Sequence, residues 1–345
     1  MTKLLSGVVQ HYDWGDQHTI PELLGVKSDS RPWAELWFGT HPGGPSVVHV
    51  KGDTPALASF TGELSFLVKV IAAAQPLSLQ THPTQEQAMI GFEHETNSGI
   101  PLTDPSRIYK DVSAKPELLC AISNFEAICG FRQVDESLRI CQENGWNELA
   151  DHLVQDGLAQ CVRWALSTND HVLPNRLPDW AQRLARIYPG SGGILVALLM
   201  NHVQLLPDEA LFLDAGNVHA YLHGTADEVM SSSDNVVRAA FTKKHTDIDE
   251  FLAVANLSPT SPSYSRPTQI DLACWQYTVP THAFGVQRID VRDNYLVTAY
   301  HGAEILLCTD GDGGALKRGQ ASVLCNGEVV QLSGPATVFR TWGSQ

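Results

Sequence analysis

The chain has 345 residues, 43% hydrophobic and 18% charged, so it can bury a full core and is long enough for two or three domains. Its 23 basic and 38 acidic residues give a net charge of −15, which repels phosphate backbones, so nucleic acid is not an expected partner. No apolar run reaches the roughly 20 residues that span a bilayer, because Asn201, His202 and Gln204 interrupt the best candidate, so no membrane role is expected.

The first 131 residues are predicted to be mostly β. Short apolar runs, such as 46–50 and 66–71, alternate with Gly, Pro, Asn and Asp. In the extended segment 79–83, Gln80 and His82 stand two residues apart and so project from the same face of a strand. Another strand is expected over 117–122, directly after Pro116.

Residues 132–204 are predicted to form a helical insert. Apolar residues recur there at helical spacing, at Leu138, Cys141, Leu149, Leu153, Leu158, Val162, Leu166, Ala181, Leu184, Ile187 and across 194–199.

The β pattern returns after Pro207. Residues 205–265 are expected to complete one β domain with residues 1–131, and residues 266–345 to form a second, with Pro259, Pro262 and Pro267 marking the junction. Within the second domain, residues 304–314 and 321–324 predict a strand, an Asp-Gly turn and a returning strand.

The expected compartment is the cytoplasm. The N-terminus has one basic residue but no sustained apolar stretch before Gln10, unlike a signal peptide. The seven cysteines are odd in number, scattered and without a C-x-x-C pair, which argues against a disulfide framework or a thiolate zinc site. We expect reduced thiols in the core.

Three distant segments carry candidate metal ligands. Gln80 and His82 share one segment, Glu117 follows Pro116, and His219 follows Gly216. Two imidazoles, one carboxylate and one amide oxygen suit zinc or another borderline divalent ion, which would remain a strong Lewis acid. Taken singly, each residue has an ordinary alternative as a surface or hydrogen-bonded side chain. As a set they predict one metal ion beside a sugar-sized pocket.

Six motifs give the chain a resemblance to a known family. They are Tyr12-Asp13-Trp14-Gly15 and the segments 32–42 (PWAELWFGTHP), 77–83 (LSLQTHP), 115–118 (KPEL), 219–222 (HAYL) and 233–239 (SDNVVRA). In this order they resemble type I mannose-6-phosphate isomerases, to about residue 252. The resemblance implies a mainly β fold of two cupin-like, jelly-roll barrels with an inserted helical domain. It also implies one zinc ion per chain, held by Gln80, His82, Glu117 and His219.

The implied reaction interconverts D-mannose 6-phosphate and D-fructose 6-phosphate without an organic cofactor, and the resemblance assigns catalytic roles to Lys115, Asp234 and Arg238. Moving a carbonyl between C1 and C2 passes through an enediolate, which needs a metal or cationic donors and a group that shuttles the proton. Arg238 is a cation that could stabilise the negative charge of the enediolate. Lys115 and Asp234 are candidate proton handlers or orienters of hydroxyls, and the base is not assigned. The alternatives are a turn residue for Asp234 and a surface cation for Arg238.

The substrate phosphate needs a cationic clamp, for which Lys243, Lys244, Arg132 and Arg238 are candidates. Lys243 and Lys244 have the alternative of a solvated surface pair.

Two residues beside the ligand motifs, Ser78 and Tyr221, are predicted to line the substrate pocket, with packing as their alternative. One departure from the family concerns Ser113 and Ala114, which stand where relatives often have Asn-His, so an imidazole that would assist ring opening is absent.

Two other functions stay open: an iron-dependent cupin oxygenase, because the same ligands hold iron, and a sugar-phosphate-binding cupin without turnover. We expect a monomer or a weak homo-oligomer.

Overall fold

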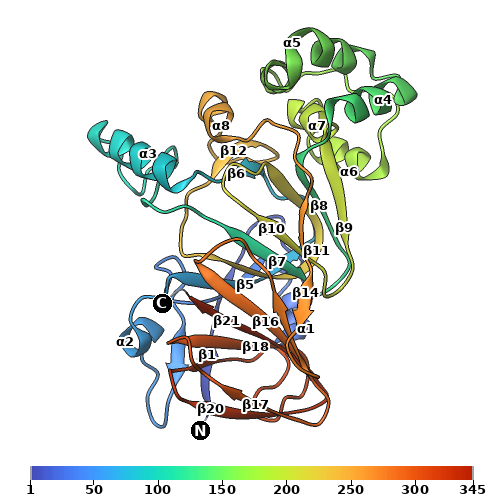
Figure 1. Ribbon diagram of the computed structural model, residues 1–345. Coiled ribbons are helices and arrows are strands. Elements are labelled where there is room, and N and C mark those ends of the chain that lie inside the picture. Colours follow the sequence, from blue (N-terminus) through green and yellow to red (C-terminus); the bar gives the residue numbers. More distant parts are fainter. Residues whose placement is uncertain (1, 344–345) are drawn as a thin grey trace.

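The computed structural model describes residues 2–343, which are mainly β. Within that range there are eight helices. They are α1 (Thr19–Leu23), α2 (Leu57–Thr61), α3 (Gln85–Asn97), α4 (Val134–Asn144), α5 (Asn147–Leu166), α6 (Asp179–Ile187), α7 (Gly192–Ala197) and α8 (Ile248–Val254). Figure 1 shows α4–α7 gathered at one end of the molecule and the C-terminal strands at the other.

The larger sheet has 11 strands and surrounds the longest one, β11 (His219–Ser231). Its main path runs β13 (Ser263–Ser265), β10 (Ala210–Leu213), β7 (Glu117–Ala121), β11, β5 (Phe66–Ala73), β3 (Glu35–Phe38) and β2 (Val8–Gln10). The first half of β11 also pairs with β6 (Leu79–Thr81) and β8 (Phe125–Phe131), with a register shift between Tyr221 and His223. Two more strands extend this half: β12 (Val237–Ala240) pairs with β6, and β9 (Met200–Leu205) with β8.

The second sheet has eight strands and joins the two ends of the chain. Its order is β14 (Pro267–Gln269), β15 (Cys274–Tyr277), β16 (Phe284–Val291), β21 (Ala336–Gly343), β18 (Glu304–Gly311), β19 (Ala321–Leu324), β1 (Lys3–Ser6) and β4 (Val47–His49). A separate two-stranded sheet consists of β17 (Asn294–Thr298) and β20 (Val329–Ser333). Strand β1 pairs with β19, placing Lys3 opposite Val323, so residues from the start of the chain complete a C-terminal sheet.

Buried side chains of both large sheets form one apolar cluster. It includes Phe38 and Phe66 from the larger sheet and Val286 and Phe339 from the second. A second cluster joins α4–α7 to β6, β8 and β12, with Leu79, Ile128 and Val237 among its members. Burial on both faces explains why β5 reads as a continuous run of buried residues.

Residues 132–204 contain helices α4, α5, α6 and α7 but end in a strand, which the helical pattern did not predict. Residues 200–205 form β9, which pairs with β8, because Met200, Val203 and Leu205 face the core while its backbone completes a sheet ladder. Helix α5 is interrupted at Gly157, whose φ of 75° suits glycine. The first 131 residues also contain α1, α2 and α3, and α3 begins with a capping box between Thr84 and Gln87.

The predicted C-terminal strand pair is present, but its turn is longer than expected. Strand β18 pairs with β19, with Glu304 opposite Leu324, yet Asp310 and Gly311 still belong to β18 and residues 312–320 make the connection. The seven cysteines are free thiols, six of them buried, as the sequence predicted. Over residues 2–343 no helix is both long and apolar enough to cross a membrane. The mainly β class with helices is confirmed, and the three domain boundaries stay a prediction.

Candidate metal centre and active site

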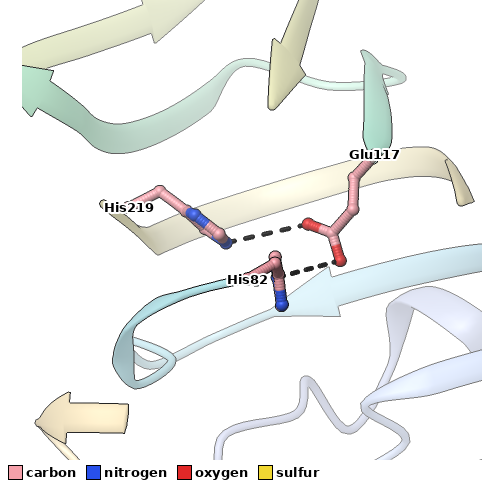
Figure 2. A group of neighbouring side chains, drawn as sticks. All are labelled: His82, Glu117 and His219. Atoms are coloured by element: carbon pink, nitrogen blue, oxygen red, sulfur yellow. Dashed lines mark ion pairs between the residues drawn. The ribbon is translucent and has the colours of Figure 1, made fainter. Parts of the chain in front are cut away.

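Three predicted ligands come together in the larger sheet. His82, Glu117 and His219 place one potential ligand atom each within 4.8 Å of the others, and all three residues are buried. The Nε2 atom of His82 lies 3.3 Å from Oε1 of Glu117, and Nε2 of His219 lies 3.7 Å from Oε2. Figure 2 shows the two imidazoles approaching the carboxylate from separate segments of the chain.

The sheet register explains this convergence. Glu117 begins β7, His219 begins β11, and His82 directly follows β6. His219 is the pairing partner of Gln80. The turn before β11 also contacts the His82 segment, because the amide of Gly216, whose φ is 76°, donates to the His82 carbonyl at 2.7 Å. A left-handed conformation at this position favours glycine, so Gly216 fixes the spacing of two ligand segments.

Both imidazoles direct Nε2 toward Glu117 because their Nδ1 atoms are engaged. His82 Nδ1 lies 2.7 Å from the Asn235 carbonyl, and His219 Nδ1 lies 3.1 Å from the Asn217 carbonyl. A carbonyl accepts only from a protonated nitrogen, so each neutral ring presents the Nε2 lone pair. His82 Nε2 is buried without a hydrogen-bond partner among the described residues. Two such nitrogens and a carboxylate fit a zinc ion.

Gln80 lies beside this trio. Its Nε2 is 3.4 Å from Nε2 of His219, while its Oε1 accepts a hydrogen bond from the Ser78 hydroxyl at 2.7 Å. Rotating the amide by half a turn exchanges the two atoms, so that Oε1 faces His219 and Nε2 donates to Ser78. The rotated amide offers an oxygen to a metal, and Ser78 stabilises either arrangement.

The protonation states also favour a cation. Burial opposes ionisation of Glu117, but Lys115, whose Nζ lies 2.8 Å from Oε1, and the two histidines outweigh it, so the pKa of Glu117 is well below its usual value. Burial lowers the pKa of His219 to about 4, and burial and Lys115 lower the pKa of His82. The site therefore holds a carboxylate and two neutral imidazoles at neutral pH, which are the forms that bind metals.

A buried polar network lies behind Glu117. The Tyr221 hydroxyl donates to Glu228 at 2.8 Å and lies 3.4 Å from Glu117 Oε2, and Lys69 Nζ is 3.2 Å from the other Glu228 oxygen. Lys69 also lies over the Trp37 ring. The sequence motifs give no role to Lys69 and Glu228, although a charged residue inside an apolar strand is rarely buried without a partner.

The predicted catalytic residues are linked to the trio or to one another by strand pairing and by charge. Arg238 is the β12 residue opposite Gln80 in β6. Asp234 interacts electrostatically with Arg238, Lys115 and Lys244. Asp234 Oδ2 lies 3.2 Å from Nε2 of His41.

The predicted phosphate contacts separate into two groups. The Nζ atom of Lys244 lies over the Tyr12 ring, 4.7 Å from its centroid. Lys244 also interacts electrostatically with Arg238 and Asp234. Lys243 instead pairs at 3.3 Å with Asp13 at the surface, where both side chains are about nine-tenths exposed. Arg132 donates to the carbonyls of Leu198 and Met200 near the helices. Lys244 is thus the lysine placed toward the candidate site.

Comparison with known proteins identifies the family. A model of the type I phosphomannose isomerase catalytic domain matches residues 1–134. The mannose-6-phosphate isomerase of Escherichia coli K12 is 34% identical, over 98% of this chain and 97% of the relative. The chain belongs to the type I mannose-6-phosphate isomerase family. The mannose-6-phosphate isomerase of Salmonella typhimurium is 33% identical, over 95% of this chain and 93% of its own length.

Solved mannose-6-phosphate isomerases also share the fold. The Salmonella typhimurium enzyme, in a crystal structure with its substrate fructose 6-phosphate and zinc, superimposes with a TM-score of 0.90 and 30% identity over the full length of both chains. Membership of the mannose-6-phosphate isomerase family, predicted from the six motifs, is confirmed.

Proposed function

We propose that this protein is a zinc-dependent aldose–ketose isomerase that interconverts D-mannose 6-phosphate and D-fructose 6-phosphate. The observation that carries the proposal is the buried His82–Glu117–His219 trio, within 4.8 Å, in a chain 34% identical to a mannose-6-phosphate isomerase over almost its whole length. The zinc- and fructose 6-phosphate-bound relative supports the choice of metal and substrate over an iron oxygenase.

We infer that His82, Glu117, His219 and Gln80 hold the ion. When bound, zinc supplies a Lewis acid that stabilises the negative charge of an enediolate. The residues around it suit the remaining tasks. We assign to Arg238, which pairs with Gln80 across β12 and β6, the stabilisation of the same charge. Lys115, at 2.8 Å from Glu117, and Asp234 remain the two candidates for moving the proton between C1 and C2.

We further propose that Lys244 contacts the substrate phosphate and that Ser78, which donates to Gln80, lines the substrate pocket. Lys244 is supported by its contact with the Tyr12 ring and by its electrostatic interactions with Arg238 and Asp234. Lys243 stays a weaker candidate because it pairs with Asp13 in solvent. For Tyr221 the contacts support a different task from lining the pocket, since its hydroxyl bonds Glu228 behind Glu117.

The proposed architecture is two cupin-like barrels and a helical domain, with residues 1–131 and 205–265, 132–204, and 266–345 as the units. Support comes from β11, whose two halves pair with different strands and so bend one sheet into two faces. Strands β1 and β4 pair into the C-terminal sheet, so short N-terminal pieces are shared between the proposed barrels. A cytoplasmic location and a monomer or weak homo-oligomer complete the proposal.

The decisive experiment is a coupled assay of zinc-loaded protein on mannose 6-phosphate. We expect turnover that a chelator abolishes and added zinc restores, and a Glu117→Ala variant that binds metal poorly and does not turn over. Full activity in a preparation verified to be metal-free would reject the mechanism. Sugar-phosphate binding without turnover would favour the non-catalytic alternative, and dioxygen consumption by an iron-loaded protein would favour the oxygenase.

A further inference from the structure

His41 is a buried histidine outside the metal trio whose two ring nitrogens both have partners. It lies in the loop after β3 and is 5% exposed. Its Nδ1 accepts a hydrogen bond of 3.1 Å from the amide of Gly43. Its Nε2 lies 3.2 Å from Oδ2 of Asp234. The ring therefore connects a fixed loop to a candidate catalytic carboxylate.

The Gly43 contact determines which nitrogen carries the proton. An amide N–H can only donate, so Nδ1 must offer its lone pair, and in the neutral ring the proton resides on Nε2. That proton points to Asp234. The plane of the ring is fixed as well, because Trp37 packs against it edge-to-face, with 5.2 Å between centroids and 86° between planes. Trp37 is in turn held by a hydrogen bond of 2.6 Å from its Nε1 to Glu35.

The backbone around Asp234 is held by Asp111 and by the segment of His82. Its amide donates to Asp111 at 3.0 Å, and the hydroxyl of the preceding Ser233 also donates to Asp111. The carbonyl of the following residue, Asn235, is the acceptor for His82 Nδ1. The Asp234 side chain is about half exposed, at 52%, so with Oδ2 at His41 its other oxygen, Oδ1, is left for a sugar hydroxyl or a transferred proton.

We propose that His41 is a positioning residue for the isomerisation: its Nε2–H holds Oδ2 of Asp234 and aims Oδ1 at the sugar. The inference rests on the proposed isomerase function and on the use of Asp234 in it. Partial burial opposes ionisation of Asp234, but His41, then Lys115 and Lys69, keep the pKa of Asp234 below its usual value, consistent with a carboxylate held by a donor.

The kinetic test uses zinc-loaded enzyme and four variants: His41→Phe, which keeps an aromatic ring without the donor, His41→Gln, which keeps a donor, Asp234→Asn, and the His41→Phe/Asp234→Asn double variant. We expect His41→Phe to lower kcat roughly tenfold, the scale of one lost hydrogen bond to a charged group, with KM for mannose 6-phosphate nearly unchanged. His41→Gln should recover most of the loss. In the Asp234→Asn background, His41→Phe should cost no more than about twofold, because a residue that acts through Asp234 has nothing left to position.

Two outcomes overturn the positioning role: an equal loss from His41→Phe in both backgrounds, or a His41→Gln variant as impaired as His41→Phe. A wild-type kcat in Asp234→Asn would also overturn the positioning role of His41, while leaving the isomerase function intact. A wild-type protein without turnover would instead reject the isomerase function itself.

A measurement on the unaltered enzyme covers the case in which His41→Phe does not fold. Nitrogen-15 chemical shifts, with the His41 signals assigned by their loss in His41→Gln, report the tautomer directly. We expect the proton on Nε2, and a proton on Nδ1 would overturn the proposal.

Discussion

Asp227 allows a quantitative prediction of how the free energy of unfolding depends on pH. It lies in β11, next to Glu228, and is fully buried. Neither of its carboxylate oxygens has a hydrogen-bond partner among the described residues. Burial, and to a smaller degree the charge of Glu228, raises the pKa of Asp227 from 3.8 to about 8. The folded protein therefore keeps this carboxyl protonated at neutral pH, while the unfolded chain ionises it.

The sign of the effect follows from proton binding. Between pH 3.8 and about 8 the folded state holds a proton at Asp227 that the unfolded state has lost, so the free energy of unfolding falls as pH rises through this window. Each pH unit costs about 1.4 kcal/mol, so Asp227 lowers stability at pH 7 by about 4 kcal/mol relative to a carboxyl that never ionises. Asp227→Asn has nearly the same shape without the ionisation. We expect it to raise stability at pH 7 by a few kcal/mol and to change it little near pH 4.

The assay is urea unfolding of wild type and Asp227→Asn at pH 4.5 and 7.5, with Asp293→Asn as the control because Asp293 is exposed. We expect the stability difference between Asp227→Asn and wild type to grow with pH and the control to show no such change. A difference that is the same at both pH values would refute the reasoning, because it would mean that Asp227 ionises alike in the folded and unfolded states.

Three further predictions concern the site. Glu117→Gln removes the carboxylate of the trio and should lower zinc affinity at least about tenfold, measured as metal retained after dialysis; full retention would argue against Glu117 as a ligand. Tyr221→Phe keeps the ring but removes the hydroxyl between Glu117 and Glu228, so zinc affinity or kcat should fall roughly tenfold, and wild-type values would limit Tyr221 to packing. Lys244→Ala should raise KM for mannose 6-phosphate about tenfold or more while Lys243→Ala changes it little, and the reverse order would exchange their roles.

The candidate metal ligands were predictable because their signals are local or motif-based. A two-residue spacing places Gln80 and His82 together, and Gly216 and Pro116 mark the turns before His219 and Glu117. These residues come together because β11 pairs with both β6 and β7. Such long-range strand pairing cannot be predicted from residue spacing alone. The family resemblance supplied that step.

Other features could not be predicted because they depend on tertiary contacts. Lys243 and Lys244 are neighbours in the sequence and both exposed, yet Lys243 pairs with Asp13 and Lys244 lies over the Tyr12 ring. Tyr221 follows a ligand by two residues, but its hydroxyl turns toward Glu228 rather than toward an open pocket. The apolar pattern of β9 is compatible with a helix, and the segment forms a strand because it pairs with β8. In contrast, the Thr84–Gln87 capping box of α3 is a signal that the local sequence does carry.

The pairing of β1 with β19 brings residues 3–5 against residues 321–323. During synthesis β1 emerges together with β4, its partner on one edge, but the β19 strand that pairs with its other edge follows more than 300 residues later. The C-terminal sheet therefore cannot be completed before residues 321–323 are available, and chains cut short before residue 321 leave an open strand edge that invites aggregation.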